Sequence, residues 1–424
     1  MLARAAYRRV LARVGSFSPA ARQFLAFSLL LSTAFAIFNL IFNLYMNALG
    51  FSNEVIGLFN SLPAIALLLV GLPAAAMADR LGYRPFLFGG GGLAVVASCV
   101  LAVVQSRLLA VLAAGTFALA VIVLGVLGSP LLTQLSSQTE RVAVFASNQS
   151  LGWIAVLIGD VVGGVIPEAA ARMAHTPSAS TAALRSAFIA TTVLTLLGLP
   201  FLLQLVRGSD LKPVASFPMR ELLHFDLGRF GRVLFPSLIL GIAAGMYLNF
   251  VQLYLSQRFG LTAGPIGLIL AVGAALTAVV TLAAPAVGRR LGITRTIGLA
   301  QVVGSPLVLA LAFLAVLPVA VAVMTVRQLA LNLQGPLGQV FGMEYVEAGQ
   351  RARLATAQAV VSGIGVGGIG PLLSGFLQVR GGYQLAFSVS AALYLLAGLT
   401  FLKLFGRVRL ASETAVSGSV SSSK

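Results

Sequence analysis

The sequence has few of the residues from which enzyme and metal sites are built. Its 424 residues include one cysteine, Cys99, and two histidines, His175 and His224. A single cysteine excludes a disulfide framework and a cysteine-based metal cluster. No Ser/His/Asp set or metal-ligand spacing can be brought to one depth, and no Gly-x-x-x-x-Gly-Lys-Ser/Thr loop is present to bind ATP. We therefore expect no enzyme activity, no cofactor and no metal.

Charge is also scarce, since only 9% of the residues are charged and 58% are hydrophobic. A soluble protein needs far more charge to cover its surface. Apolar runs long enough to cross a bilayer core of about 30 Å recur along the chain. Each is bounded by a charged or Pro/Gly-containing break. We expect an all-α membrane protein with twelve transmembrane helices, at about 23–49, 53–77, 86–105, 108–132, 143–166, 186–206, 230–257, 262–287, 294–314, 318–342, 354–377 and 383–406.

Acidic residues are fewer than basic ones, and the formal net charge is +17. With both termini in the cytoplasm, 22 of the 28 Lys and Arg lie inside, five lie outside and one, Arg327, lies within a span. Basic loops stay on the cytoplasmic side of a membrane, so the excess of Lys and Arg indicates how the protein is oriented and that it contacts anionic lipids. It does not indicate nucleic-acid binding. We predict a multi-pass protein of the plasma (inner) membrane, with no cleavable signal because the first apolar run is too long.

The polar run 207–229 divides the chain into two sets of six spans. The predicted organisation is a basic cytoplasmic segment (1–22), a six-helix bundle (23–206), a cytoplasmic linker (207–229), a second bundle (230–406) and a cytoplasmic tail (407–424). A shift of 210 residues places Asn39 on Asn249, Gly50 on Gly260 and the Arg-Leu-Gly of 80–82 on that of 290–292. Because six is even, both copies insert with one orientation, related by an axis along the membrane normal.

The loop between spans two and three, ADRLGYRP at 78–85, resembles the cytoplasmic signature of the major facilitator superfamily. The residues that match are Asp79, Arg80, Gly82 and Arg84. The resemblance extends over the whole chain and implies that superfamily's fold, two pseudo-symmetric six-helix halves. Asp79 could accept from the N–H groups of a neighbouring helix start or pair with Arg80 or Arg84, and so latch the cytoplasmic side in one state. The alternative is a loop that only sets topology. In the second copy Arg289 replaces the aspartate.

Span five carries GDVVGG at 159–164, which resembles the Gly-Pro-x-x-Gly-Gly signature of proton-driven drug antiporters in the superfamily, with Asp160 in the place of the proline. Span eleven carries GPLLSG at 370–375 in the equivalent place. Small residues at this spacing let helix backbones approach closely. Ordinary packing would explain the glycines but not Asp160, the one acid placed well inside the membrane. We expect Asp160 to couple transport to protons or to form an ion pair.

Polar groups at bilayer depth are costly and normally face the protein interior or a water-filled cavity. Arg327 lies about nine residues into span ten and is followed by Gln328, Asn332 and Gln334. The resemblance places spans one, four, seven and ten around the central cavity, so Arg327 could anchor an anionic or polar substrate there. A fixed ion pair, with Asp160 as its partner, is the alternative.

Spans one and seven each carry a polar stripe on one helix face. The first stripe holds Asn39, Asn43 and Asn47, and the second holds Asn249, Gln252 and Ser256. These amides could bind substrate or could join helices to one another. The predicted substrate-binding residues are Asn39, Asn43, Asn249, Gln252, Arg327 and Asn332.

These observations favour a secondary active transporter that works by alternating access, as a proton-coupled exporter of a small solute. Uptake of a sugar-like or anionic metabolite is the alternative within this class. A transporter-shaped receptor or lipid-handling scaffold is the alternative of another class. We expect a monomer whose partners are a small-molecule substrate, the lipid bilayer and protons, with no nucleic acid.

Overall fold

The computed structural model describes residues 17–137, 140–208, 227–281, 283–347, 350–408 and 410, and helices account for nearly all of them. Of the predicted organisation, the basic segment 1–22, the linker 207–229 and the tail 407–424 lie largely outside the described residues. The chain forms two compact units. The first comprises Met1–Leu49, Ala66–Phe217 and Thr262–Ala271, and the second comprises Gly50–Ile65, Pro218–Leu261 and Val272–Lys424.

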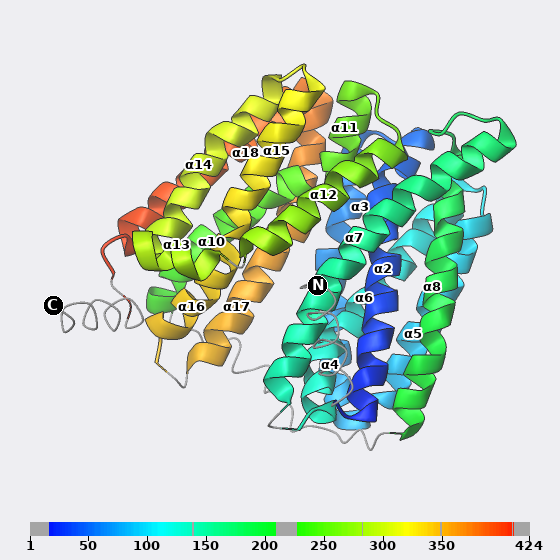
Figure 1. Cartoon of the computed structure of the whole chain (residues 1–424), viewed down its shortest axis with the longest axis horizontal. Coiled ribbons are helices and arrows are strands. Elements are labelled where there is room, and N and C mark those ends of the chain that lie inside the picture. Colours follow the sequence, from blue (N-terminus) through cyan, green and yellow to red (C-terminus); the bar gives the residue numbers. More distant parts are fainter. Residues whose placement is uncertain are drawn as a thin grey trace, which may run out of the picture. The chain divides into compact units, whose positions relative to one another are not determined.

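In the first unit, α2, α6, α7 and α8 run side by side (Figure 1). Its apolar core gathers Phe24 and Leu25 of α2, Tyr83, Leu127 of α6 and Leu205 of α8. Many other apolar side chains are exposed, as lipid-facing residues are. The helices of this unit are α2 (Pro19–Ala48), η1 (Leu67–Gly71), α4 (Leu72–Leu81), α5 (Arg84–Val103), α6 (Arg107–Leu135), α7 (Arg141–Ala174) and α8 (Thr181–Gly208), with the first part of α12 (Ala263–Thr281).

In the second unit, α18 packs against both α10 and α14 (Figure 1). Its core gathers Phe230, Ile297, Phe341, Phe401 and Phe405. The helices of this unit are α3 (Asn53–Ala66), α10 (Leu227–Leu248), α11 (Val251–Phe259), the rest of α12, α13 (Ala284–Leu291), α14 (Ile293–Phe313), α15 (Leu317–Asn332), α16 (Gln334–Tyr345), α17 (Arg351–Ile364), η3 (Gly365–Ile369) and α18 (Gly370–Phe405).

The described chain contains eleven helical stretches long and apolar enough to cross a membrane. The last of them, Arg353–Phe405, is 53 residues long. It holds two spans, because Gly381 and Gly382 leave the helical conformation, with φ of −143° and 63°. The chain is therefore a multi-pass membrane protein, and its spanning segments match the twelve predicted.

Glycines at equivalent places show that the two copies share one backbone plan. Gly50 and Gly260 end the first span of each copy with φ of 84° and 67°. Gly82 and Gly292 follow the second span with φ of 86° in both. Residues other than glycine rarely adopt positive φ, so the two copies use glycine for the same turns. The pseudo-symmetric two-half architecture predicted from the 210-residue repeat is confirmed.

Two helices differ from the predicted spans in a way that concerns the site. Helix α7 continues to Ala174 instead of ending near residue 166, so Asp160 lies 14 residues from its end. Span seven is broken into α10 and α11 at Asn249 and Phe250. Apolar runs mark only the part of a helix that lies in lipid, and therefore miss polar extensions such as 167–174.

Candidate polar site

Arg327 lies inside the second unit, on α15, with 3% of its surface exposed. Its guanidinium carbon is 3.9 Å from the ring centroid of Tyr247 on α10 and 5.3 Å from that of Tyr394 on α18. It also donates a hydrogen bond to the Tyr394 hydroxyl. Two electron-rich ring faces compensate part of the cost of burying the charge. The Arg327 Nε has no hydrogen-bond partner in the described chain, so the guanidinium has one N–H donor available for a further hydrogen bond.

The polar residues that follow Arg327 bond within the same unit, either to a neighbouring helix or along their own helix. Gln328 donates to Thr277 on α12 at 3.2 Å, and Asn332 donates to the Gln328 carbonyl at 2.8 Å. Gln301 on α14 donates to Gln334 at 3.0 Å. This face of α15 and α16 thus combines one buried charge with a set of amides.

On α2, the predicted stripe is uneven in exposure. Asn39 is the one exposed residue between Gln23 and Ala48, although Phe38 and Leu40 beside it are buried. Asn43 is 4% exposed and Asn47 is half-buried. On α11, the Gln252 Oε1 atom is buried and has no partner in the described residues. Of the two stripes, Asn39 is thus open to solvent, and Gln252 has an acceptor without a partner among the described residues.

Asp160 lies on α7 in the first unit, with 8% of its surface exposed. Within the described residues its carboxylate has no hydrogen bond or ion pair. Its backbone carbonyl lies directly against Gly267 of α12. A carboxylic acid that is nine-tenths buried without a partner can hold or release a proton at bilayer depth.

Residues of the predicted latch lie at the end of span two. Arg80 is exposed at the end of α4, Gly82 forms the turn, and Arg84 is exposed at the start of α5. Tyr83, which departs from the superfamily pattern, is fully buried in the core of the first unit. The side chain of Asp79 lies outside the described residues.

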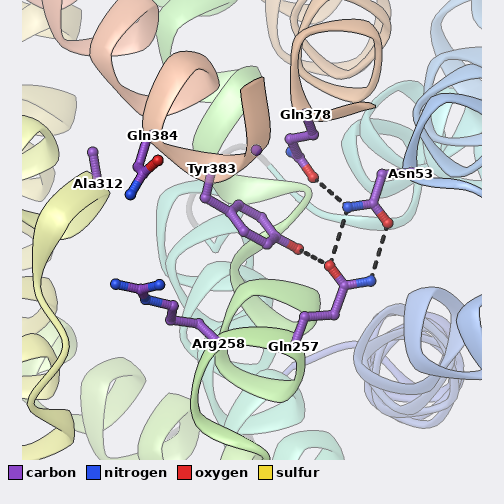
Figure 2. Close-up of a pocket in the computed structure, with 8 residues that line it drawn as sticks. Asn53, Gln257, Arg258, Ala312, Gln378, Tyr383 and Gln384 are labelled. Carbon is purple, nitrogen blue, oxygen red and sulfur yellow. Dashed lines mark hydrogen bonds between the residues drawn. The ribbon is translucent and has the colours of Figure 1, made fainter. Parts of the chain in front are cut away.

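Sequence reasoning missed a polar cluster in the second unit and Glu168 in the first. A cavity of about 340 Å³ is lined by Asn53, Gln257, Arg258, Ala312, Gln378, Gly382, Tyr383 and Gln384. Figure 2 shows three amides and the Tyr383 hydroxyl bonded to one another at its side. Glu168, on α7, accepts from Ser178 at 3.3 Å and from Thr262. A polar residue one turn after each Gly-rich motif was the signal available in the sequence.

The family model of the Major Facilitator Superfamily matches residues 24–367. The chain belongs to this superfamily. No curated protein sequence matches it. Among solved structures of the superfamily fold, it resembles a bacterial homolog of the human lysosomal transporter Spinster, in an inward-facing and occupied conformation, at 13% identity and TM-score 0.73 over 90% of this chain and 96% of that one.

Two further transporters have the same fold. The nucleoside transporter NupG is 17% identical with a TM-score of 0.71, over 92% of this chain and 99% of that one. A D-xylose–proton symporter is 17% identical with a TM-score of 0.67, over 90% of this chain and 96% of that one. At these identities the likeness shows the fold that this major facilitator protein shares with them.

Asn249 in this major facilitator chain bonds within its own unit. Its amide nitrogen donates to the Gly245 carbonyl at 3.0 Å and to the Val366 carbonyl at 2.8 Å. Val366 lies in the π-helix η3, whose widened turn changes the pairing of backbone carbonyls. The Asn249 side chain thus ties the break in span seven to the irregular turn in span eleven.

Asn249→Ala is therefore expected to lower the free energy of unfolding by about 1–3 kcal/mol, because the partly buried Val366 carbonyl loses its side-chain donor. Thermal unfolding of the purified protein in detergent measures this. The repeat mate Asn39, which is exposed, provides the control: Asn39→Ala should change stability by less than about 0.5 kcal/mol. Equal stability of the two variants would contradict a structural role for Asn249.

Proposed function

We propose that this chain is a proton-coupled secondary transporter that exports a small polar solute by alternating access. Asp160 is the observation that supports the coupling most directly. Burying a carboxylic acid without a partner inside the membrane costs free energy, and acids in such positions commonly belong to proton pathways. Its backbone lies at the crossing of α7 and α12, where a change in helix packing would alter its surroundings.

In this proposal the solute contacts amides on spans one, seven and ten and the Arg327 guanidinium. Asn39 is exposed, and in the described part of the chain the Gln252 Oε1 and the Arg327 Nε have no hydrogen-bond partner. Asn43, Asn249 and Asn332 complete the predicted set. Such a set suits a solute with several hydroxyl or carbonyl groups and one negative charge, since amides bond the former and the guanidinium bonds the latter.

Uptake is the second candidate, because the amide-rich composition also suits sugar-like and nucleoside-like solutes. The nucleoside transporter and the D-xylose–proton symporter, which share the fold, are named for solutes of this kind. For either direction, we propose the inner membrane as the location, with both termini in the cytoplasm. The positive-inside distribution of Lys and Arg supports that orientation.

Reconstitution into proteoliposomes with a pH gradient of either sign tests coupling and direction together. A panel of labelled solutes would include sugars, nucleosides, carboxylated metabolites and cationic drugs. Export coupled to protons predicts accumulation only when protons flow opposite to the solute. Accumulation with protons and solute flowing together would favour uptake, and indifference to the pH gradient for every transported solute would contradict proton coupling.

Asp79→Asn is expected to slow transport about tenfold, the effect of losing about 1.4 kcal/mol of differential stability between two states. The reason is that a neutral amide interacts less strongly with a helix start or with an arginine. Initial rates in proteoliposomes measure it. Arg289→Asn, at the equivalent position of the second copy, is the matched control and should have little effect. A scaffold that never alternates would be indifferent to both substitutions.

A further inference from the structure

The cavity of about 340 Å³ in the second unit is lined by polar groups of two kinds. Three of its amides and the Tyr383 hydroxyl bond to one another, so the polar atoms of this cluster have partners. Figure 2 shows Arg258 and Gln384 away from that cluster, past the Tyr383 ring. Neither side chain makes a hydrogen bond or an ion pair with a described residue. Among the described residues that line it, the cavity therefore offers a ligand one guanidinium and one amide.

Two glycine turns bring these side chains to the cavity. Arg258 lies in the last turn of α11, which Gly260 ends with φ of 67°. Gln384 lies two residues after Gly382, which breaks α18 with φ of 63°. Residues other than glycine rarely adopt such a conformation, so the backbone itself fixes where the two spans turn. Because both side chains are exposed, they can meet a ligand without any change in the core.

A row of aromatic rings joins the wall of the cavity to the buried guanidinium of the same unit. The Tyr383 ring lies 5.2 Å from that of Tyr254 and 5.5 Å from that of Phe387. Phe387 lies 5.4 Å from Tyr247, on which Arg327 stacks. Rings packed in this way hold their positions, so the wall is preorganised for a ligand. The second unit thus has an exposed arginine at the cavity and a buried one at the other end of the row.

Topology does not account for Arg258. It is one of only five Lys and Arg among 28 that the predicted orientation places on the outer side, where basic residues are not needed to orient the chain. Arg185 and Arg380, also expected outside, donate to the backbone carbonyls of Val103 and Phe376 at 3.5 and 3.3 Å. Arg258 makes no such bond within the described chain and lines a cavity instead.

The lining indicates the chemistry of the ligand. A guanidinium binds a carboxylate through two parallel hydrogen bonds, and one guanidinium balances one negative charge. The Gln384 amide can donate to and accept from hydroxyl groups, and the Tyr383 oxygen can still accept. A volume of about 340 Å³ is at the small end of the range of about 300–1,000 Å³ for ligand pockets. These features suit a small monocarboxylate that carries hydroxyl groups.

We propose that this cavity is a second solute site, the outer site (Arg258, Tyr383 and Gln384), which binds a small hydroxylated monocarboxylate on the side of the membrane opposite the termini. Its role rests on the proposed function: the outer site holds the same anionic solute that Arg327 binds inside the unit. In export the solute occupies the outer site after it leaves Arg327, and in uptake it does so before. The Arg258 guanidinium binds the carboxylate, and Gln384 binds a hydroxyl group.

Equilibrium binding of labelled gluconate to the full chain in lipid nanodiscs tests the outer site. The Arg327→Met protein lacks the inner anion contact and should still bind one gluconate per chain. Adding Arg258→Gln should raise the Kd of that site about 10–100-fold, because charge-assisted hydrogen bonds are lost. Adding Arg258→Lys should raise it less, since the charge stays and the planar fork is lost. Gluconamide has the same hydroxyl groups without the charge and should compete at least about tenfold less well than gluconate.

Arg380→Gln is the matched control, because it removes an exposed arginine that stacks on Phe376 and does not line the cavity. In the Arg327→Met background it should change the Kd by less than about twofold. Equal Kd values for the Arg258→Gln and Arg380→Gln proteins, equal competition by gluconamide, or no gluconate binding to Arg327→Met would each overturn the outer site.

The side of the membrane is tested in whole cells. Arg258→Cys in a Cys99→Ser background should react with a membrane-impermeant maleimide, and a cysteine that reacts only after the cells are opened would overturn the assigned side. Transport assays separate this proposal from the proposed function. If Arg258 controls gluconate binding but no solute is transported, the proposed function fails and the outer site stands. If transport depends on Arg327 while Arg258→Gln alters neither binding nor transport, the outer site fails and the proposed function stands.

Discussion

Asp160→Asn is expected to abolish solute accumulation driven by a pH gradient, lowering it at least a hundredfold, while leaving solute exchange at equal concentrations intact. Asparagine has nearly the shape of a protonated aspartic acid but cannot release a proton. The variant can therefore still carry solute in both directions, which exchange at equal concentrations measures. It cannot use the proton gradient, because no proton is exchanged at this position in its cycle.

Two proteoliposome assays on one preparation measure both properties: accumulation under a pH gradient, and counterflow of labelled solute without a gradient. Asp160→Glu is the control, because it keeps a titratable group on the same helix face and should retain part of the coupled transport. Asp160→Ala should lose coupling as the asparagine variant does. Full gradient-driven transport by Asp160→Asn would contradict the coupling proposed here.

Much of the fold could be predicted because the bilayer restricts which secondary structures a membrane-spanning segment can form. A segment that crosses the bilayer must satisfy its backbone hydrogen bonds internally, so long apolar runs become helices. Glycines that a turn requires can also be predicted: the 210-residue shift pairs Gly50 with Gly260 and Gly82 with Gly292, and all four have positive φ. The break at Gly381 and Gly382 likewise separates the last two spans.

The partners of the polar residues could not be predicted in the same way. Arg327 was expected to anchor substrate or to pair with a carboxylate, and it packs on Tyr247 and Tyr394, 80 and 67 residues away. Asn249 bonds to a carbonyl 117 residues further on. Aromatic rings and backbone carbonyls occur in every span, so the sequence does not show which one a buried donor will meet. That choice follows from the crossing geometry of the helices.

Arg327→Met is expected to lower transport of an anionic solute at least a hundredfold while changing the free energy of unfolding by no more than about 2 kcal/mol. The loss of transport reflects the charge-assisted bonds of the guanidinium, which are worth about 1.5–3 kcal/mol each. The small change in stability follows from two opposed effects. The stacking on Tyr247 and Tyr394 is lost, at about 2 kcal/mol, but a buried charge without an ion pair in the described chain is also removed.

Concentration-dependent uptake in proteoliposomes and thermal unfolding in detergent separate the two effects. The double variant Arg327→Met, Tyr394→Phe controls for the tyrosine hydroxyl that the single variant leaves without its donor, and should be at least as stable as the single one. Arg327→Lys keeps the charge but cannot stack or present a planar fork, so it should recover only part of the transport. A methionine variant that transports normally but has an unfolding temperature several degrees lower would contradict this role. Arg327 would then only stabilise the packing of α10, α15 and α18, and the anionic group of the solute would bind elsewhere.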